Sequence, residues 1–169
     1  MRVLGIDPGS LATGYGLVTV QGSTLRRVAG GTIRARGETL ADRLAHLQRE
    51  LARAIEELAP EVAALEAVFS AKNARSALVL GHARGVALAA CGCAGLVPAE
   101  YTPQQVKAAV TGYGRAEKPQ VMKMVQRLLG LAEPPPSDEA DALAIAICHG
   151  MGLRMGAAVR AAQIAERAP

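Results

Sequence analysis

Aromatic side chains are nearly absent from this chain, which has one Phe, three Tyr and no Trp among its 169 residues. Proteins that bind single-stranded nucleic acid without sequence preference stack successive bases on several aromatic rings. So few rings cannot form such a platform, and the composition therefore argues against that class of protein.

Cysteine and histidine are also scarce, with three residues of each. The cysteines, Cys91, Cys93 and Cys148, are odd in number and lack the spacing of a disulfide framework, and no zinc-type spacing of Cys and His appears. We therefore expect each cysteine to be a small, buried hydrophobic side chain. A cytoplasmic location, where thiols stay reduced, fits this pattern.

Long hydrophobic runs are missing as well. The most apolar stretch, residues 85–99 (GVALAACGCAGLVPA), is short and interrupted by Gly and Pro, so no membrane-spanning helix is predicted. The N-terminus enters a predicted strand almost at once, which leaves no room for a signal peptide. Residues 138–141 read DEAD, but the chain has no Gly-Lys pair, which excludes the GxxxxGK[ST] phosphate loop of a helicase.

The remaining composition is that of a folded, moderately basic protein. Half of the residues are hydrophobic, a fifth are charged, and the formal net charge is +4. Intrinsic disorder is thereby excluded, and the length suits one domain with a substantial core. The positive charge favours a polyanionic partner such as nucleic acid. We expect one domain over residues 1–155 and an Ala/Arg-rich tail over residues 156–169.

Hydrophobic periodicity predicts three strands followed by alternating helices and strands. The strands are expected at residues 3–7, 14–20, 24–35, 62–65 and 96–101. The helices are expected at residues 38–59, 73–90, 103–110, 118–130 and 138–153. This order predicts an α/β fold in which a five-stranded mixed sheet carries helices on both faces.

Acidic residues stand where apolar segments begin or end. Asp7 ends the first predicted strand, where it is either a ligand at the crevice of an α/β sheet or the first residue of the turn DPGS. Glu66 is embedded in an apolar run, which favours a metal ligand over a salt bridge to a distant base. Asp138 and Asp141 share one helix face. Acids in a first turn also complement the helix dipole, and this alternative is stronger for Asp138 and Glu139 than for Asp141.

Carboxylates that arrive from separate elements are best explained by a divalent cation that gathers them. Oxygen ligands select hard ions, so Mg²⁺ or Mn²⁺ is expected rather than zinc. Two such cations about 3.5–4 Å apart can stabilise the charge that phosphodiester cleavage builds on the attacking and leaving oxygens. Together with the basic composition, the acids point to a metal-dependent nuclease.

Several basic residues and the single Phe follow these acids. Lys72, Arg75, Lys107 and Lys118 are candidate phosphate contacts, and the last two lie near predicted helix starts. The alternative for each of them is a solvated helix face. Phe69 is either a core residue or an apolar wedge that unstacks a base step.

Four segments of the chain carry a resemblance to a known family. They are GIDPGSLATGYG (5–16), EAVFSAKNARSALVLGHARGVALAA (66–90), TPQQVKAAVTGYGRAEKPQV (102–121) and SDEADALAIAICH (137–149). Together they resemble the RuvC family of Holliday junction resolvases. The resemblance implies a ribonuclease H-like fold, a homodimer and Mg²⁺-dependent resolution of four-way DNA junctions in recombination and repair. Paired symmetric nicks, 5′-phosphate and 3′-hydroxyl ends, and two Mg²⁺ per subunit, replaceable by Mn²⁺, belong to the same expectation. So does a branch-migration helicase complex as partner.

The same resemblance assigns roles to particular residues. The catalytic and metal-binding acids would be Asp7, Glu66, Asp138 and Asp141. Lys107 and Lys118 would contact the junction, and Phe69 would stack on a base. Pro119 and the Ala/Arg-rich tail are not features that we associate with the family, so the local loop shape and the function of the tail do not follow from it.

Two other functions remain as alternatives. GIDPGS also resembles the first phosphate loop of actin-like ATPases and sugar kinases, but those enzymes need two such lobes and 169 residues supply one. The other alternative is a module that binds junctions without cutting them. Four carboxylates that face phosphates would repel DNA unless a metal intervenes, which argues against this alternative.

Overall fold

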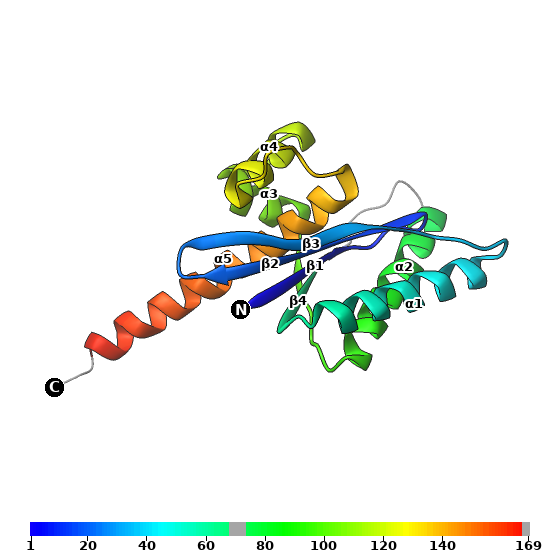
Figure 1. Ribbon diagram of the computed structural model, residues 1–169, viewed down its shortest axis with the longest axis horizontal. Helices are drawn as coiled ribbons and strands as arrows, with labels where there is room; N and C mark the ends of the chain where they lie inside the picture. Colours follow the sequence, from blue (N-terminus) through cyan, green and yellow to red (C-terminus); the bar gives the residue numbers. More distant parts are fainter. Residues whose placement is uncertain (68–73, 167–169) are drawn as a thin grey trace.

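The computed structural model describes residues 1–67 and 74–166, with the backbone alone for Arg75 and residues 157–166. Its strands form one sheet in the order β3-β2-β1-β4-β5 (Figure 1). β1 is antiparallel to β2 but parallel to β4, so the sheet is mixed. The strands span Arg2–Asp7 (β1), Ala12–Gln21 (β2), Thr24–Arg34 (β3), Val62–Glu66 (β4) and Ala99–Tyr101 (β5).

Helices cover both faces of this sheet. Figure 1 shows α1 and α2 on one face, and α5 with α3 and α4 on the other. This arrangement confirms the expected α/β class and the five-stranded mixed sheet. The helices span Leu40–Leu58 (α1), Ala74–Cys93 (α2), Pro103–Thr111 (α3), Lys118–Leu129 (α4) and Ser137–Glu166 (α5). Because α5 runs without a break through residues 155 and 156, the division into a domain and a tail stays a prediction.

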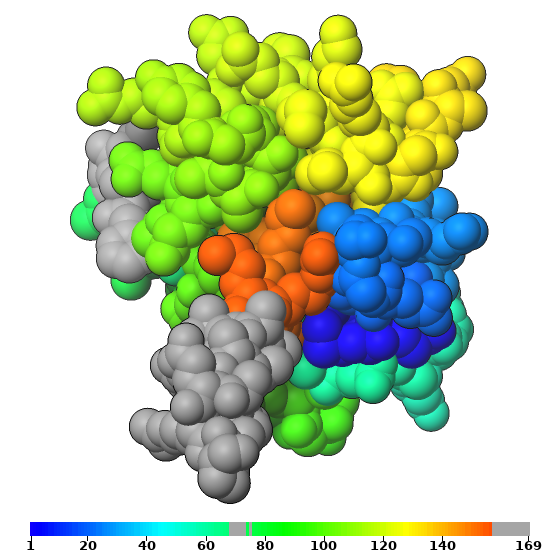
Figure 2. Space-filling model, turned by 90° about the vertical axis from the view of Figure 1, so that its left-hand side faces the viewer, coloured from blue at the N-terminus to red at the C-terminus, as the bar shows by residue number. Residues whose placement is uncertain are grey.

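Helix α5 lies close against the centre of the sheet because glycines leave room for it. A Cβ at Gly5 of β1 would collide with the carbonyl oxygen of Ala142, and one at Gly14 of β2 with that of Asp138. Residues 142–148 of α5 are buried, and apolar burial of this kind stabilises the contact. In Figure 2 the visible part of α5 lies between the blue β2–β3 hairpin and the green and yellow surface of α3 and α4. The first turn of α5 is thereby fixed over β1 and β2.

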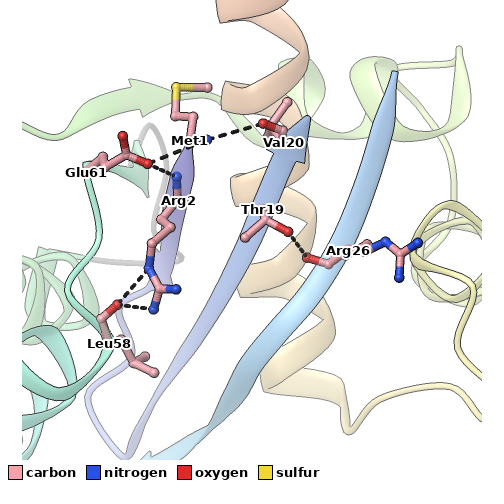
Figure 3. Close-up of polar contacts among 7 residues, drawn as sticks. All are labelled: Met1, Arg2, Thr19, Val20, Arg26, Leu58 and Glu61. Atoms are coloured by element: carbon pink, nitrogen blue, oxygen red, sulfur yellow. Dashed lines mark hydrogen bonds and ion pairs between the residues drawn. The ribbon is translucent and has the colours of Figure 1, made fainter. Parts of the chain in front are cut away.

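The N-terminal end of β1 is anchored on both sides (Figure 3). The guanidinium of Arg2 donates to the carbonyl oxygen of Leu58, from Nε at 3.2 Å and from the terminal nitrogen Nη2 at 2.5 Å. The backbone N–H of Arg2 donates to the Glu61 carboxylate, and the amino group of Met1 donates to the carbonyl oxygen of Val20 at 3.3 Å. These bonds tie the start of β1 to the end of α1, to the segment before β4 and to β2.

Helix α2 differs from expectation in two respects. Cys91 is buried, as is Cys148 in α5, but Cys93 is exposed because it lies on the opposite side of α2 from Cys91. Over Ser76–Cys93, α2 also has the length and the mean hydropathy, 1.3, of a membrane span, with 22% of that window buried. Length and composition alone are weak evidence for a membrane, but they show that α2 presents an apolar surface that the described chain leaves largely uncovered.

Candidate active site

Two of the candidate acids end neighbouring parallel strands. Asp7 is the last residue of β1 and Glu66 the last of β4, with Ile6 paired to Leu65 in the preceding row. The carboxyl ends of adjacent parallel strands open at the same edge of a sheet, which is where α/β folds bind ligands. Asp141 comes from the first turns of α5, which the glycine contacts fix over the same edge.

These three carboxylates line one hollow of about 210 Å³. Lys107 of α3 and Lys118 of α4 complete its polar lining. The remaining walls are apolar apart from backbone groups, and they are formed by Pro103, Val106, Val121, Ala144 and Ile145. The structure therefore brings together three of the four predicted acids and two of the predicted basic residues.

Burial and neighbouring acidic groups raise the pKa of two of these carboxyls, Asp7 and Glu66. Burial, and then the charges of Glu66 and Asp141, raise the pKa of Asp7 from 3.8 to about 7, while Lys118 opposes the change. Burial also raises the pKa of Glu66, followed by the charge of Asp141, whereas a side-chain hydrogen bond with Asp7 lowers it. A cluster whose ionised form is this unfavourable is a strong candidate for a cation site.

The two lysines partly offset this negative charge. Nζ of Lys118, the first residue of α4, donates to Oδ2 of Asp141 at 2.6 Å. This hydrogen bond is the main cause of the raised pKa of Lys118. Lys107 lies in α3, which begins with a capping box between Thr102 and Gln105, and its charge lowers the pKa of Glu66. Both lysines therefore face the acids, which favours a functional role over a merely solvated helix face.

The positions of Asp7, Glu66 and Asp138 bear on the alternatives that the sequence left open for each of them. Asp7 lies in β1 and its side chain lines the hollow. Among the side chains that the structure describes, none forms an ion pair with Glu66, so the salt-bridge alternative finds no support there. Asp138 does not line the hollow, although its charge contributes to the raised pKa of Asp7. It therefore lies at the periphery of the site.

Sequence reasoning missed the role of Glu139, which it treated as a first-turn acid that complements the helix dipole. Glu139 is 4% exposed, and its Oε1 accepts a hydrogen bond from Nε of Arg27 in β3 at 2.6 Å. A Cβ at Gly30 would lie 2.6 Å from the same carboxylate, so this glycine leaves the space that Glu139 fills. The pair ties the turn that carries Asp138 and Asp141 to the edge of the sheet. The Gly30-Gly31 pair inside a predicted strand was the one sequence signal of such a close approach.

Three of the predicted DNA contacts cannot be placed. Phe69 and Lys72 fall in residues 68–73, which lie outside the described residues. Arg75 belongs to α2, but its side chain is not among those described. Their roles stay predictions.

The donor set suits a hard divalent cation, although the side chains do not yet surround one. Within the described residues, no three His, Cys, Asp or Glu side chains are arranged so that they hold a metal as they stand. Oδ2 of Asp141 instead pairs with the ammonium of Lys118. Oxygen-only donors nevertheless fit Mg²⁺ or Mn²⁺ better than zinc.

Comparisons with known proteins were consistent with one another. The family model described as crossover junction endodeoxyribonuclease RuvC matches residues 3–149. The chain is 55% identical to the protein of that name from Syntrophotalea carbinolica over 150 residues, 88% of this chain and 93% of the relative. It is 52% identical to the one from Hahella chejuensis over 149 residues, 88% and 87% of the two chains.

Solved structures give the same picture. The fold matches the Thermus thermophilus RuvC in complex with a Holliday junction substrate with a TM-score of 0.87 and 37% identity, over 92% of this chain and 96% of that one. The yeast mitochondrial resolvase Ydc2 matches with a TM-score of 0.63 over 88% and 77% of the two chains, and at 16% identity this likeness concerns the fold alone.

Proposed function

Since the chain belongs to the RuvC family of crossover junction endodeoxyribonucleases, with a ribonuclease H-like fold, we propose that it resolves four-way DNA junctions. The reaction would be the hydrolysis of one phosphodiester in each of two strands of like polarity, by paired symmetric nicks that leave 5′-phosphate and 3′-hydroxyl ends. One observation carries the proposal: carboxylates from β1, β4 and α5 meet in a hollow that two lysines flank.

Asp7, Glu66 and Asp141 would hold two Mg²⁺ ions per subunit, with Asp138 assisting from the periphery, and Mn²⁺ is the expected substitute. Such ions supply charge stabilisation for the attacking and leaving oxygens, and they activate water as a nucleophile. The chain contributes the position of the donors, because two adjacent strands and one packed helix fix the three carboxylates. It also contributes apolar walls, Val106 and Ile145 among them, that limit bulk water around the reacting phosphate.

The lysines have a separate role in this proposal. Lys107 and Lys118 would neutralise the phosphate that enters the hollow, since both face the acids from α3 and α4. Lys118 would also exchange its partner, because a cation on Asp141 competes with the ammonium that now binds this carboxylate. An ammonium released in this way is placed to contact DNA.

The same proposal includes a homodimer in which α2 forms the interface. Leu78 on α2 is 65% exposed, and a Cβ at Gly81 or Gly85 would meet nothing within 4 Å. Covering this apolar face with the α2 of a second copy would bury it and would place two active sites about a two-fold axis. Two sites related in this way suit symmetric nicking. A branch-migration helicase complex as partner and a cytoplasmic location complete the proposal.

The experiment that tests this function uses a synthetic four-way junction, incubated with the protein in Mg²⁺ and in EDTA. We expect paired, symmetric nicks that DNA ligase can seal, and none in EDTA. Equally tight junction binding without cleavage in Mg²⁺ and Mn²⁺ would instead establish a junction-binding module. Measurable ATP affinity would favour the ATPase alternative.

A further inference from the structure

Tyr101 joins elements that surround the acidic hollow, although its own side chain is not part of the lining. It is the last residue of β5, the edge strand beside β4, and it pairs with Glu66. Paired residues on adjacent strands lie about 4.8 Å apart and point to the same face of the sheet. Tyr101 is therefore the neighbour of Glu66 on the face that α5 covers.

Main-chain contacts of Tyr101 hold the end of β4 and the start of α3. Its carbonyl oxygen accepts a hydrogen bond from the N–H of Ala67 at 2.8 Å, so it fixes the residue that follows Glu66. The next residue, Thr102, is the N-cap of α3, the helix that carries Lys107. β5 pairs with β4 over three residues only, so this short ladder leaves the position of the strand end to be set by contacts with the helices.

The side chain of Tyr101 makes such a contact with α5. Its hydroxyl oxygen shares a hydrogen bond with Nδ1 of His149 across 2.8 Å, and the ring centroids lie 5.7 Å apart. His149 is 8% exposed, and loss of its partner would leave a buried polar group unpaired. On the other face of β5, the Glu100 carboxylate pairs with Arg84 of α2. The Tyr101–His149 bond is thus a link between β5 and α5, the helix that carries Asp141.

We propose that Tyr101 and His149 are positioning residues of the metal site, because their hydrogen bond sets the position of Glu66 relative to Asp141. The inference rests on the proposed function, since it concerns the acids that would hold the ions there. Neither side chain lines the hollow, so the pair acts through the carboxylates and not on the ion itself. Hydrogen bonds outside the ligand set commonly change metal affinity by about 10–100-fold.

The affinity of the full chain for Mn²⁺ without DNA, measured from the electron paramagnetic resonance signal of free Mn²⁺, tests the proposal. Tyr101→Phe removes only the hydroxyl and should weaken Mn²⁺ binding about tenfold, as should His149→Leu. His149→Asn has the shape of the leucine variant but places an amide near the position of Nδ1, so it should bind nearly as tightly as wild type. Ile55→Val is the control, because it loosens the buried core on the α1 face and should lower the melting temperature without changing Mn²⁺ affinity.

Junction cleavage in Mg²⁺ separates this inference from the proposed function. Tyr101→Phe should keep wild-type junction affinity in EDTA and need about tenfold more Mg²⁺ for half-maximal cleavage. Wild-type Mn²⁺ affinity in Tyr101→Phe, or equal losses in His149→Asn and His149→Leu, would overturn the inference, while cleavage by the wild type would preserve the function. An equal loss in Ile55→Val would reduce the pair to a structural contact, and a wild type that binds no Mn²⁺ would also refute the inference. Weaker Mn²⁺ binding by Tyr101→Phe in a protein that cuts no junction would remove the function and keep the positioning role.

Discussion

The ammonium of Lys118 lies 2.6 Å from Oδ2 of Asp141, although 23 residues separate them in sequence. Lys118 opens α4 and Asp141 lies in the first turns of α5, so the contact links two helices across the mouth of the acidic hollow. The same ammonium lowers the pKa of Asp7. One lysine therefore restrains one acid of the cluster and influences the ionisation of another.

Replacing Lys118 by Gln should accordingly alter both the rate and the pH dependence of cleavage. Without the positive charge the pKa of Asp7 rises further, so the rising limb of activity moves to higher pH. Loss of a phosphate contact should lower the rate roughly 100-fold at neutral pH. Single-turnover cleavage of a junction across a pH series measures both effects. A rate loss with an unshifted pH profile would contradict the electrostatic coupling, and Lys123→Gln, on the same helix but outside the acidic hollow, is the control.

Asp7→Asn should abolish nicking while junction binding survives. The amide keeps the shape of the side chain but cannot supply the negative charge that two hard cations require. We expect a loss of at least about a thousandfold in rate, with junction affinity equal to or above that of wild type, because one carboxylate no longer repels phosphates. Gel-shift and cleavage assays on one junction distinguish the two effects. Normal nicking by this variant in Mg²⁺ would refute the metal assignment.

The raised pKa of Asp7 also predicts how stability depends on pH in the absence of metal. The pKa is about 7 in the folded protein and 3.8 in the reference state, so between these values the native state binds a proton that the unfolded state does not. Stability should therefore decrease as pH rises from about 4 to about 7, by on the order of a few kcal/mol in total. Mg²⁺ should restore it above pH 7, because the ion binds the carboxylate form.

Calorimetric melting of wild type and Asp7→Asn in EDTA, at pH 5 and pH 8, tests this prediction. The variant has no carboxyl at this position, so it should lose less stability between the two pH values and should exceed wild type at pH 8. An Asp42→Asn variant is the contrast, because Asp42 belongs to the capping box of α1 and its pKa is lowered. Equal pH dependence in wild type and Asp7→Asn would show that Asp7 is not the group responsible.

The sequence predicted the strands, and with them two of the acids, because the positions of Asp7 and Glu66 follow from where apolar runs end. Local patterns were sufficient there. Asp138 and Asp141 were expected to act together on one helix face, but Asp138 lies outside the hollow. Residues three apart on a helix differ by about 60° around its axis. At the edge of the hollow this angle is enough for Asp141 to line it while Asp138 does not.

Glu139 could not be assigned from its neighbours, because its burial depends on a residue 112 positions away. The Gly30-Gly31 pair signals a close approach to the strand, but nothing local to Arg27 or Gly30 indicates that an acid of the last helix makes it. The prediction that Cys93 is buried was wrong for a similar reason. Its helix face is exposed, while that of Cys91 is covered. The burial of Glu139 and the exposure of Cys93 depend on which helices and strands pack together. A single sequence gives only indirect information about that packing.

The Arg27–Glu139 pair should contribute to stability and to the position of the first turn of α5. Arg27→Met leaves a carboxylate that is almost fully buried without its partner, and removal of one member of such a pair costs about 3–5 kcal/mol. Arg27 is one-third exposed, so we expect the low end of that range. Urea unfolding measures the change. Arg53→Met, whose ion pairs with Glu50 and Glu57 are exposed, should change stability by less than about 1 kcal/mol.

A role of the Arg27–Glu139 pair in positioning Asp141 is tested by a measurement other than stability. If the pair holds the turn that carries Asp141, Arg27→Met should raise the Mg²⁺ concentration needed for half-maximal cleavage, even where the variant is fully folded. Glu139→Gln, which removes the buried charge, should partly relieve the stability loss in the double variant. An unchanged Mg²⁺ requirement would reduce the pair to a purely structural contact.

Exposed apolar residues on α2 lead to the last prediction, that Leu78→Glu converts a dimer into a monomer. Leu78 is 65% exposed on a helix whose apolar window is 22% buried, so a charge there costs the isolated subunit little. At an interface the same charge would be buried without a partner.

Val97→Glu is the matched control, because Val97 is 94% exposed and lies after α2. Light scattering after gel filtration should give a monomer for Leu78→Glu and a dimer for wild type and Val97→Glu. Paired nicking should give way to single nicks in the monomer, since one active site cannot cut two strands at once. Retention of the dimer by Leu78→Glu would place the interface elsewhere.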